Sequence, residues 1–143
     1  MMFSVLTKED IPFILSAKDY GFNDVWDEDM LLSAFESGRF FGYIIYRGDK
    51  KIGFITFDKS IDEADIEDIF VIPEFRKQGY GKLLVKKALC ALKDEGFKKV
   101  FLEVRESNAP ARKVYESFGF KKISERKKYY DGVETAIVYV KEF

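Results

Sequence analysis

The segment that most constrains the fold lies near the middle of the chain, where a strand, a glycine loop and a helix are predicted to follow one another. Residues 64–72 are rich in β-branched and apolar side chains, and Pro73 cannot donate a backbone hydrogen bond to a sheet. Residues 80–95 carry leucines and alanines on one helical face and lysines elsewhere, which is typical of an amphipathic helix, and Gly96 can end it. The turn between strand and helix contains the sequence Arg76-Lys77-Gln78-Gly79-Tyr80-Gly81-Lys82.

This glycine loop is predicted to bind an anion. Its glycines leave backbone N–H groups accessible, and the start of the following helix adds about half a positive charge. Arg76, Lys77 and Lys82 add cationic side chains, so a ligand that carries phosphate fits the loop. The spacing excludes a Walker loop, which needs glycine in place of Arg76, and a dinucleotide fingerprint, which needs glycine in place of Leu84. A plain turn before a surface helix is the alternative.

The composition excludes several enzyme classes. The chain contains no histidine, which rules out Ser-His-Asp and Cys-His hydrolysis and the usual metalloprotease site. Its single cysteine, Cys90, excludes an internal disulfide and a thiolate metal cluster, and its place in the apolar helix predicts a small buried hydrophobic side chain. We therefore expect no metal, and we expect proton transfer by Glu, Asp, Lys, Tyr, Cys or water.

The remaining pattern predicts one α+β domain over residues 1–143. Within residues 64–72, alternation predicts Ile66, Phe70 and Ile72 on one face and Glu67, Ile69 and Val71 on the other. Further strands are predicted at residues 3–6, 40–47, 51–58, 100–104, 120–127 and 134–142, and further helices at 8–18, near 27–38 and from Asn108 to before Gly119.

Charge is divided unevenly along the chain. Residues 1–75 hold 7 basic and 16 acidic side chains, whereas residues 76–143 hold 17 basic and 9 acidic ones. We expect the basic half to meet an anion and the acidic half a cation. The basic residues at 121–128 alternate along a strand, which indicates a solvated edge and not a nucleic-acid site. Neither a membrane span nor a signal peptide is evident, so the predicted location is cytoplasmic.

The loop sequence Arg76-x-x-Gly79-x-Gly81 resembles the signature of the GCN5-related N-acetyltransferase (GNAT) family, Arg/Gln-x-x-Gly-x-Gly/Ala. Residues 102–120 are similar to the second half of the family pattern, with its Asn, Ala, Tyr and Gly-Phe spacing, and the resemblance covers essentially the whole chain. It implies an α+β fold with a mixed, mainly antiparallel sheet of about seven strands flanked by helices. The fourth and fifth strands would be splayed to admit the arm of a cofactor.

Within the family, the chain is most similar to bacterial ribosomal-protein alanine N-acetyltransferases. The similarity rests on Leu102-Glu103-Val104-Arg105-x-x-Asn108 and on Arg126-Lys127-Lys128-Tyr129-Tyr130. It implies acetyl transfer to the N-terminal alanine of a ribosomal protein. The chain departs from the subfamily where Asp131-Gly132 follows the tyrosines without a spacer.

The resemblance also implies acetyl-CoA as co-substrate. Its pyrophosphate would lie on the glycine loop, and its pantetheine arm would pair with the preceding strand. The implied cofactor-binding residues are Ile69, Phe70, Val71, Arg76, Lys77, Gln78, Gly79, Tyr80, Gly81, Lys82 and Asn108. Asn108 is also predicted to cap the helix that follows it.

Two residues are implied to move protons. Glu103 interrupts an apolar strand and points with Phe101; the resemblance makes it the proton acceptor, and a solvent-facing residue paired with a lysine is the alternative. By pattern alone Tyr115 is a core aromatic residue, whereas the resemblance makes it the donor to the departing thiolate.

Other residues are placed around the acceptor. Glu67 and Asp68, on the strand before the loop, are the rival bases, with Glu67 ranked after Glu103. Glu67 is also a substrate-binding candidate. By resemblance, Tyr129 and Tyr130 flank the acceptor peptide.

A terminal amine suits a chain without histidine. With a pKa of about 7.8, roughly 14% of it is neutral at pH 7, against about 0.04% for a lysine of pKa about 10.4. A small amine such as a polyamine, an aminoglycoside or an amino acid is an alternative acceptor, and a non-catalytic acyl-CoA-binding module is a further one. We expect a monomer or a weak homodimer.

Overall fold

The computed structural model describes residues 2–23, 25–130 and 132–143, and the side chains of these residues except 128–130. Its strands in this part of the chain are β1 (Phe3–Val5), β2 (Phe40–Arg47), β3 (Lys50–Lys59), β4 (Glu63–Val71), β5 (Lys99–Arg105), β6 (Lys121–Tyr130) and β7 (Glu134–Glu142). They form a seven-stranded sheet in the order β1-β2-β3-β4-β5-β7-β6. Neighbouring strands are antiparallel except β4 and β5, which are parallel. The predicted fold class is confirmed.

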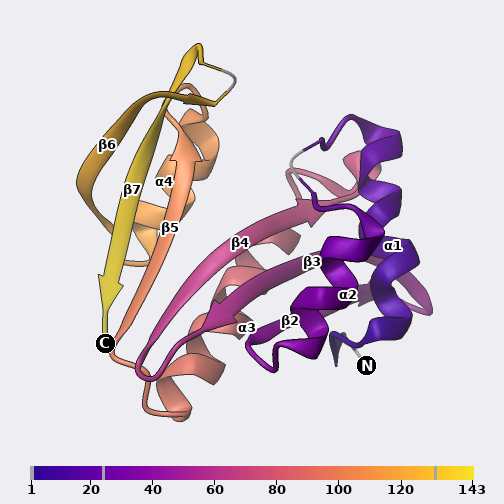
Figure 1. Cartoon of the computed structure of the whole chain (residues 1–143). Helices are drawn as coiled ribbons and strands as arrows, with labels where there is room; N and C mark the ends of the chain where they lie inside the picture. Colours follow the sequence, from indigo (N-terminus) through magenta and orange to yellow (C-terminus); the bar gives the residue numbers. More distant parts are fainter. Residues whose placement is uncertain (1, 24, 131) are drawn as a thin grey trace.

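Helices cover both faces of the sheet. The α-helices are α1 (Ile11–Ser16), α2 (Glu28–Glu36), α3 (Tyr80–Asp94) and α4 (Ala109–Ser117), and the short 3-10 helices are η1 (Lys8–Asp10), η2 (Ala17–Tyr20) and η3 (Pro73–Phe75). Figure 1 shows α1 and α2 on one side of β2, β3 and β4, with α3 on the other. The first helix, predicted at residues 8–18, is instead divided into three short helical segments, η1, α1 and η2.

The helices begin where their capping residues predict. The Asp27 side chain accepts a hydrogen bond from the Met30 N–H at 2.9 Å, and the Asn108 side chain accepts one from the Ala111 N–H at 3.2 Å. The predicted helix cap at Asn108 is confirmed. No helix in the described part of the chain combines the length and the apolarity needed to cross a membrane.

Two apolar cores lie on opposite faces of the sheet. One packs α3 against β2 to β5 and β7, through residues such as Leu84, Ala88 and Val100. The other packs α1 and α2 against β2, β3 and β4, through residues such as Ile14 and Leu31. The sheet is thus fixed by burial on both sides.

Cys90 corrects one expectation. It is exposed, although the apolar character of its helix predicted burial. The buried side chains of α3 are Leu84, Val85, Ala88, Leu89 and Leu92. Cys90 lies off this stripe because each residue rotates about 100° around the helix axis.

A bulge in β4 corrects the predicted alternation. Asp68 lies opposite Thr56 and Ile66 lies opposite Phe57, so Glu67 is the extra residue with no register partner in β3. The phase of the strand changes there: Ile66 joins Val71 in the core with α3, while Phe70 joins the opposite core. The expectation that Ile66 shares a face with Phe70 was therefore wrong.

The parallel pairing of β4 with β5 ends after three residue pairs, Glu63 with Lys99, Ala64 with Val100 and Asp65 with Phe101. Beyond Asp65, β4 pairs only with β3, and Figure 1 shows the two halves of the sheet diverging from this end. The predicted splay of the fourth and fifth strands is confirmed.

The close packing of β2 on β3 leads to a stability prediction. A Cβ atom added at Gly42 would lie 2.2 Å from the Ile55 carbonyl oxygen, whereas one added at Gly81 would meet no atom within 4 Å. We expect Gly42→Ala to lower the free energy of unfolding by about 2 kcal/mol, because the backbone must shift. Urea denaturation measures this change. Gly81→Ala is the matched control and should not destabilise the fold; equal stability of the two variants would contradict the prediction.

Candidate functional site

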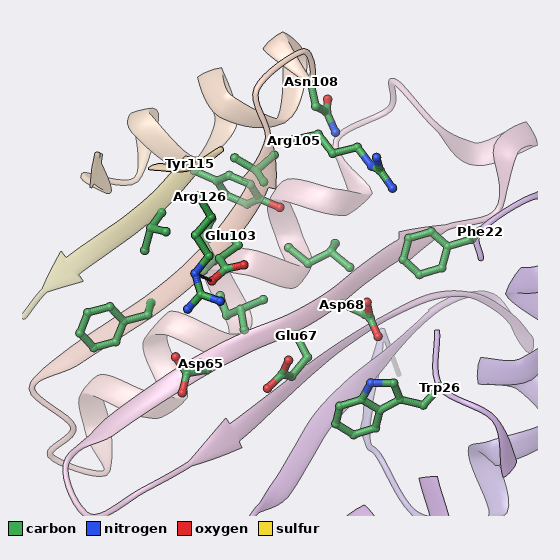
Figure 2. Close-up of a pocket in the computed structure, with 16 residues that line it drawn as sticks. Phe22, Trp26, Asp65, Glu67, Asp68, Glu103, Arg105, Asn108, Tyr115 and Arg126 are labelled. Carbon is green, nitrogen blue, oxygen red and sulfur yellow. Dashed lines mark ion pairs between the residues drawn. The ribbon is translucent and has the colours of Figure 1, made fainter. Parts of the chain in front are cut away.

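A pocket of about 860 Å³ occupies the space where β4 and β5 diverge. Figure 2 shows that side chains from both splayed strands, from α4, from β6 and from the segment before α2 line this space. The pocket brings together five residues singled out in the sequence: Glu67, Ile69, Glu103, Asn108 and Tyr115. It also contains residues that the sequence did not single out as a set, Phe22, Trp26, Asp65, Arg105 and Arg126 among them.

Glu103 lies on the pocket face of β5. Its neighbours Leu102 and Val104 are buried in the core with α3, so strand alternation turns Glu103 the other way, as predicted. Its carboxylate Oε1 lies 3.1 Å from Nε of Arg126 on β6. The ionic partner is therefore an arginine two strands away, not a lysine.

Glu67 faces Glu103 across the pocket, as Figure 2 shows. Burial, together with the negative charges of Asp65, Asp58 and Glu103, raises the pKa of its carboxyl to about 7. The side chain still reaches solvent through the open pocket, although the pocket walls surround it. The bulge gives Glu67 this position.

Asp65 extends the acidic wall of β4. Burial raises its pKa, and the charges of Asp58 and Glu63 act in the same direction, while Arg39 lowers it. Arg39 forms an ion pair with Asp58 at 2.7 Å. The pocket thus has carboxylates on both strands at the point where they separate.

Tyr115 reaches the pocket from α4. Its ring contacts the rings of Phe120 and Tyr139, with centroids 6.0 and 6.4 Å away. Tyr139 is fully buried, and its hydroxyl donates a hydrogen bond to Glu116 Oε2 at 2.7 Å and accepts one from Arg112 Nε at 3.1 Å. These contacts hold α4 on β7, so Tyr115 is both packed and directed into the pocket.

The glycine loop lies beyond the C-terminal end of β4, outside the pocket lining. Its backbone has positive φ angles at Lys77 (62°) and Gly79 (89°). The Arg76 side chain donates from Nε to the Val71 carbonyl at 2.8 Å, and its guanidinium lies 5.6 Å from the centre of the Phe70 ring. Arg76 therefore ties the loop back to β4, a contact that the sequence did not predict.

The splayed edge of β4 offers backbone groups to a ligand. The Ile72 N–H binds the Ile52 carbonyl of β3 at 2.8 Å. Because successive residues of a strand direct their backbone groups to opposite sides, Ile69 and Val71 direct theirs toward the edge that β5 has left. The Val71 carbonyl accepts the hydrogen bond from Arg76. The Val71 N–H and the N–H and C=O of Ile69 are therefore the backbone groups of this edge that a ligand could bind.

Other predicted site residues have different outcomes. Tyr129 and Tyr130 were predicted to flank the acceptor, and their side chains lie outside the described residues. Among the described residues, no group of three or more carboxylate or thiol side chains is arranged to hold a metal ion. Phe22 and Trp26 could have been suspected only from their place in the polar stretch before α2.

Known proteins match both the sequence and the fold. The family model described as "Acetyltransferase (GNAT) family" matches residues 6–120. A [ribosomal protein bS18]-alanine N-acetyltransferase of Haemophilus influenzae is 38% identical over 104 residues, which is 70% of each chain. The enzyme of the same name from Escherichia coli K12 is 31% identical over 138 residues, 94% of this chain and 93% of its own.

Solved structures agree with this match. The crystal structure of the Escherichia coli ribosomal-protein-S18-alanine N-acetyltransferase has a TM-score of 0.89 at 29% identity and covers 99% of this chain and 94% of its own. An acetyltransferase from Bacillus anthracis, crystallised with acetyl coenzyme A, has a TM-score of 0.66 at 32% identity and covers 73% of this chain and 63% of its own. With the glycine-loop signature and the splayed sheet, these matches show that the chain belongs to the GNAT family and is an N-acetyltransferase.

Proposed function

We propose that this enzyme transfers the acetyl group of acetyl-CoA to the N-terminal amine of a protein, with the N-terminal alanine of a ribosomal protein as the acceptor. The observation that carries the proposal is that one pocket contains the open edge of β4 at Ile69 together with Glu103 and Tyr115. The acceptor is taken from relatives that are named for acetylating the alanine of ribosomal protein bS18.

The residues present fit acetyl-CoA. We assign its pyrophosphate to the N–H groups of the loop around Gly79 and Gly81, with Lys77 and Lys82 adding charge. The pantetheine arm is assigned to the open edge at Ile69 and Val71, where it would replace the missing strand pairing. Phe70 supports this edge through its buried side chain, and Asn108 lines the pocket at its far end. The related acetyltransferase crystallised with acetyl coenzyme A supports the choice of co-substrate.

When bound, the thioester supplies an acyl carbon open to attack and a thiolate leaving group. In our proposal the Glu103 carboxylate accepts, directly or through a water, the proton that the acceptor nitrogen loses. The Tyr115 hydroxyl gives its proton to the departing sulfur. The Val71 N–H, on the open edge, donates a hydrogen bond to the carbonyl oxygen as negative charge develops there.

Glu67 is the second candidate for the base. The observation in its favour is its pKa of about 7, which would let it accept a proton near neutral pH. We place Glu103 first because its carboxylate is already paired with a cation and lies on the same side of the pocket as Tyr115. Glu67 is then a contact for the cationic acceptor.

The acceptor class can be tested directly. A peptide that begins Ala-Arg should be acetylated on its terminal nitrogen, because that amine is partly neutral at pH 7 and the pocket wall is acidic. Mass spectrometry after incubation with acetyl-CoA locates the added group. The same peptide with a formylated N-terminus and an internal lysine is the control and should stay unmodified. Modification of small amines alone would disprove the protein acceptor.

The roles of Glu103 and Tyr115 can be tested by substitution. Glu103→Gln should lower kcat by about 100-fold because it removes the proton acceptor, and Tyr115→Phe should lower kcat by at least about tenfold. Calorimetry should find coenzyme A affinity unchanged in both. Glu106→Gln, the same substitution at an exposed position just after β5, is the matched control. If Glu103→Gln keeps the activity of the control, Glu103 is not the base.

The raised pKa of Glu67 gives a prediction for stability. The folded protein holds a proton on Glu67 up to pH about 7, whereas the unfolded chain releases it near the ordinary value of 4.5. Stability due to this group is therefore lost as the pH rises from about 4.5 to 7. Thermal unfolding should show that Glu67→Gln gains stability over the wild type across this range. A constant difference between pH 4.5 and 7 would show that Glu67 titrates normally.

A further inference from the structure

An ion pair crosses the sheet and joins its edge strand to Glu103. Arg126 lies on β6, Glu103 lies on β5, and β7 runs between them. Arg126 is opposite Ala136 on β7, and Glu103 is opposite Val138. Residues opposite one another share a face of the sheet, so the small side chain of Ala136 leaves room for Arg126 to lie across β7. Its Nε reaches Glu103 Oε1 at 3.1 Å.

The other charged groups around Glu103 are mostly negative. The β4 side of the pocket presents Asp65, Glu67 and Asp68, and Asp58 of β3 contributes to the field at Glu67. On β5, the guanidinium of Arg105 is directed to Glu134 of β7, at 3.6 Å. Tyr115 approaches from α4, and β7 presents the uncharged Val138. Among the side chains that the structure describes, Arg126 is thus the cation in a direct ion pair with Glu103.

We propose that Arg126 is a positioning residue for the reaction: its ion pair with Glu103 aims that carboxylate into the pocket, into which the Tyr115 side chain is also directed. This inference rests on the proposed role of Glu103 as base. It gives the edge strand β6 a role in the reaction, because Arg126 on β6 orients the Glu103 carboxylate, which lies two strands away.

The physical reason is the directed geometry of a charge-assisted contact. A guanidinium beside a carboxylate holds that side chain in one orientation and offsets its repulsion from the other carboxylates of the pocket. The negative charge of Glu103 is one of the causes that raise the pKa of Glu67 to about 7. A guanidinium is suited to this task because it stays charged at every pH at which the enzyme could work. Arg126 is more than half exposed, so solvent weakens its effect without removing it.

Three variants separate positioning from simple packing. Arg126→Met removes the charge, Arg126→Lys keeps it, and Lys127→Met removes a charge from the adjacent exposed position of β6 as the matched control. We expect Arg126→Met to lower kcat/KM about tenfold at pH 7 and to move the acid limb of its pH profile up by about one unit. Arg126→Lys should recover most of the rate. Lys127→Met should match the wild type, and coenzyme A affinity should be equal in all.

A second measurement does not depend on acetyl transfer. With ¹³C-labelled glutamate, NMR follows the titration of Glu67, whose pKa should rise in Arg126→Met, because the charge of Glu103 is no longer balanced, and fall in Glu103→Gln. If Glu103→Gln stays active, the proposed base is wrong, while this titration still decides the charge effect of Arg126. The inference is overturned if the pKa of Glu67 is the same in Arg126→Met as in the wild type, or if Arg126→Met loses activity equally at every pH.

Discussion

The early end of the β4–β5 pairing is the constraint on which the rest of the structure depends. The strand pairing between the two halves of the sheet consists of the three residue pairs that end with Asp65 and Phe101. Beyond them β4 keeps its hydrogen bonds to β3 but has an unpaired edge on the other side, which in a closed sheet would be satisfied by a strand. An unpaired edge beside a pocket is suited to an extended ligand, because the ligand can supply the missing pairing.

The two cores make this open edge possible. A strand that loses one neighbour is held only by the other neighbour and by its side chains. Val71 packs into the core with α3, and Phe70 packs into the core with α1 and α2. The Phe70 ring lies 5.6 Å from that of Phe54, and its side chain is 2% exposed. Burial on both faces thus keeps β4 in place where β5 has left it.

The electrostatics of the pocket follow from the same geometry. The bulge turns Glu67 into the gap, and alternation on β5 turns Glu103 toward it. Burial in this partly enclosed space is the main cause of the raised pKa of Glu67, and the charges of Asp65, Asp58 and Glu103 add to it. The acidic first half of the chain therefore meets the pocket through β4, while the basic second half supplies the glycine loop and Arg126.

The sequence by itself determined the local features of this protein. The glycine loop after Pro73, the amphipathic helix α3 and the cap at Asn108 depend on residues close together in the chain, so their patterns predict them. Alternation also predicted the face of Glu103, because the strand is regular around it. The direction of Glu67 was decided by tertiary structure, since a bulge depends on the register with β3, which no local pattern specifies. The pairing of Arg126 with Glu103 was decided in the same way, because it exists only after β7 has inserted between their strands.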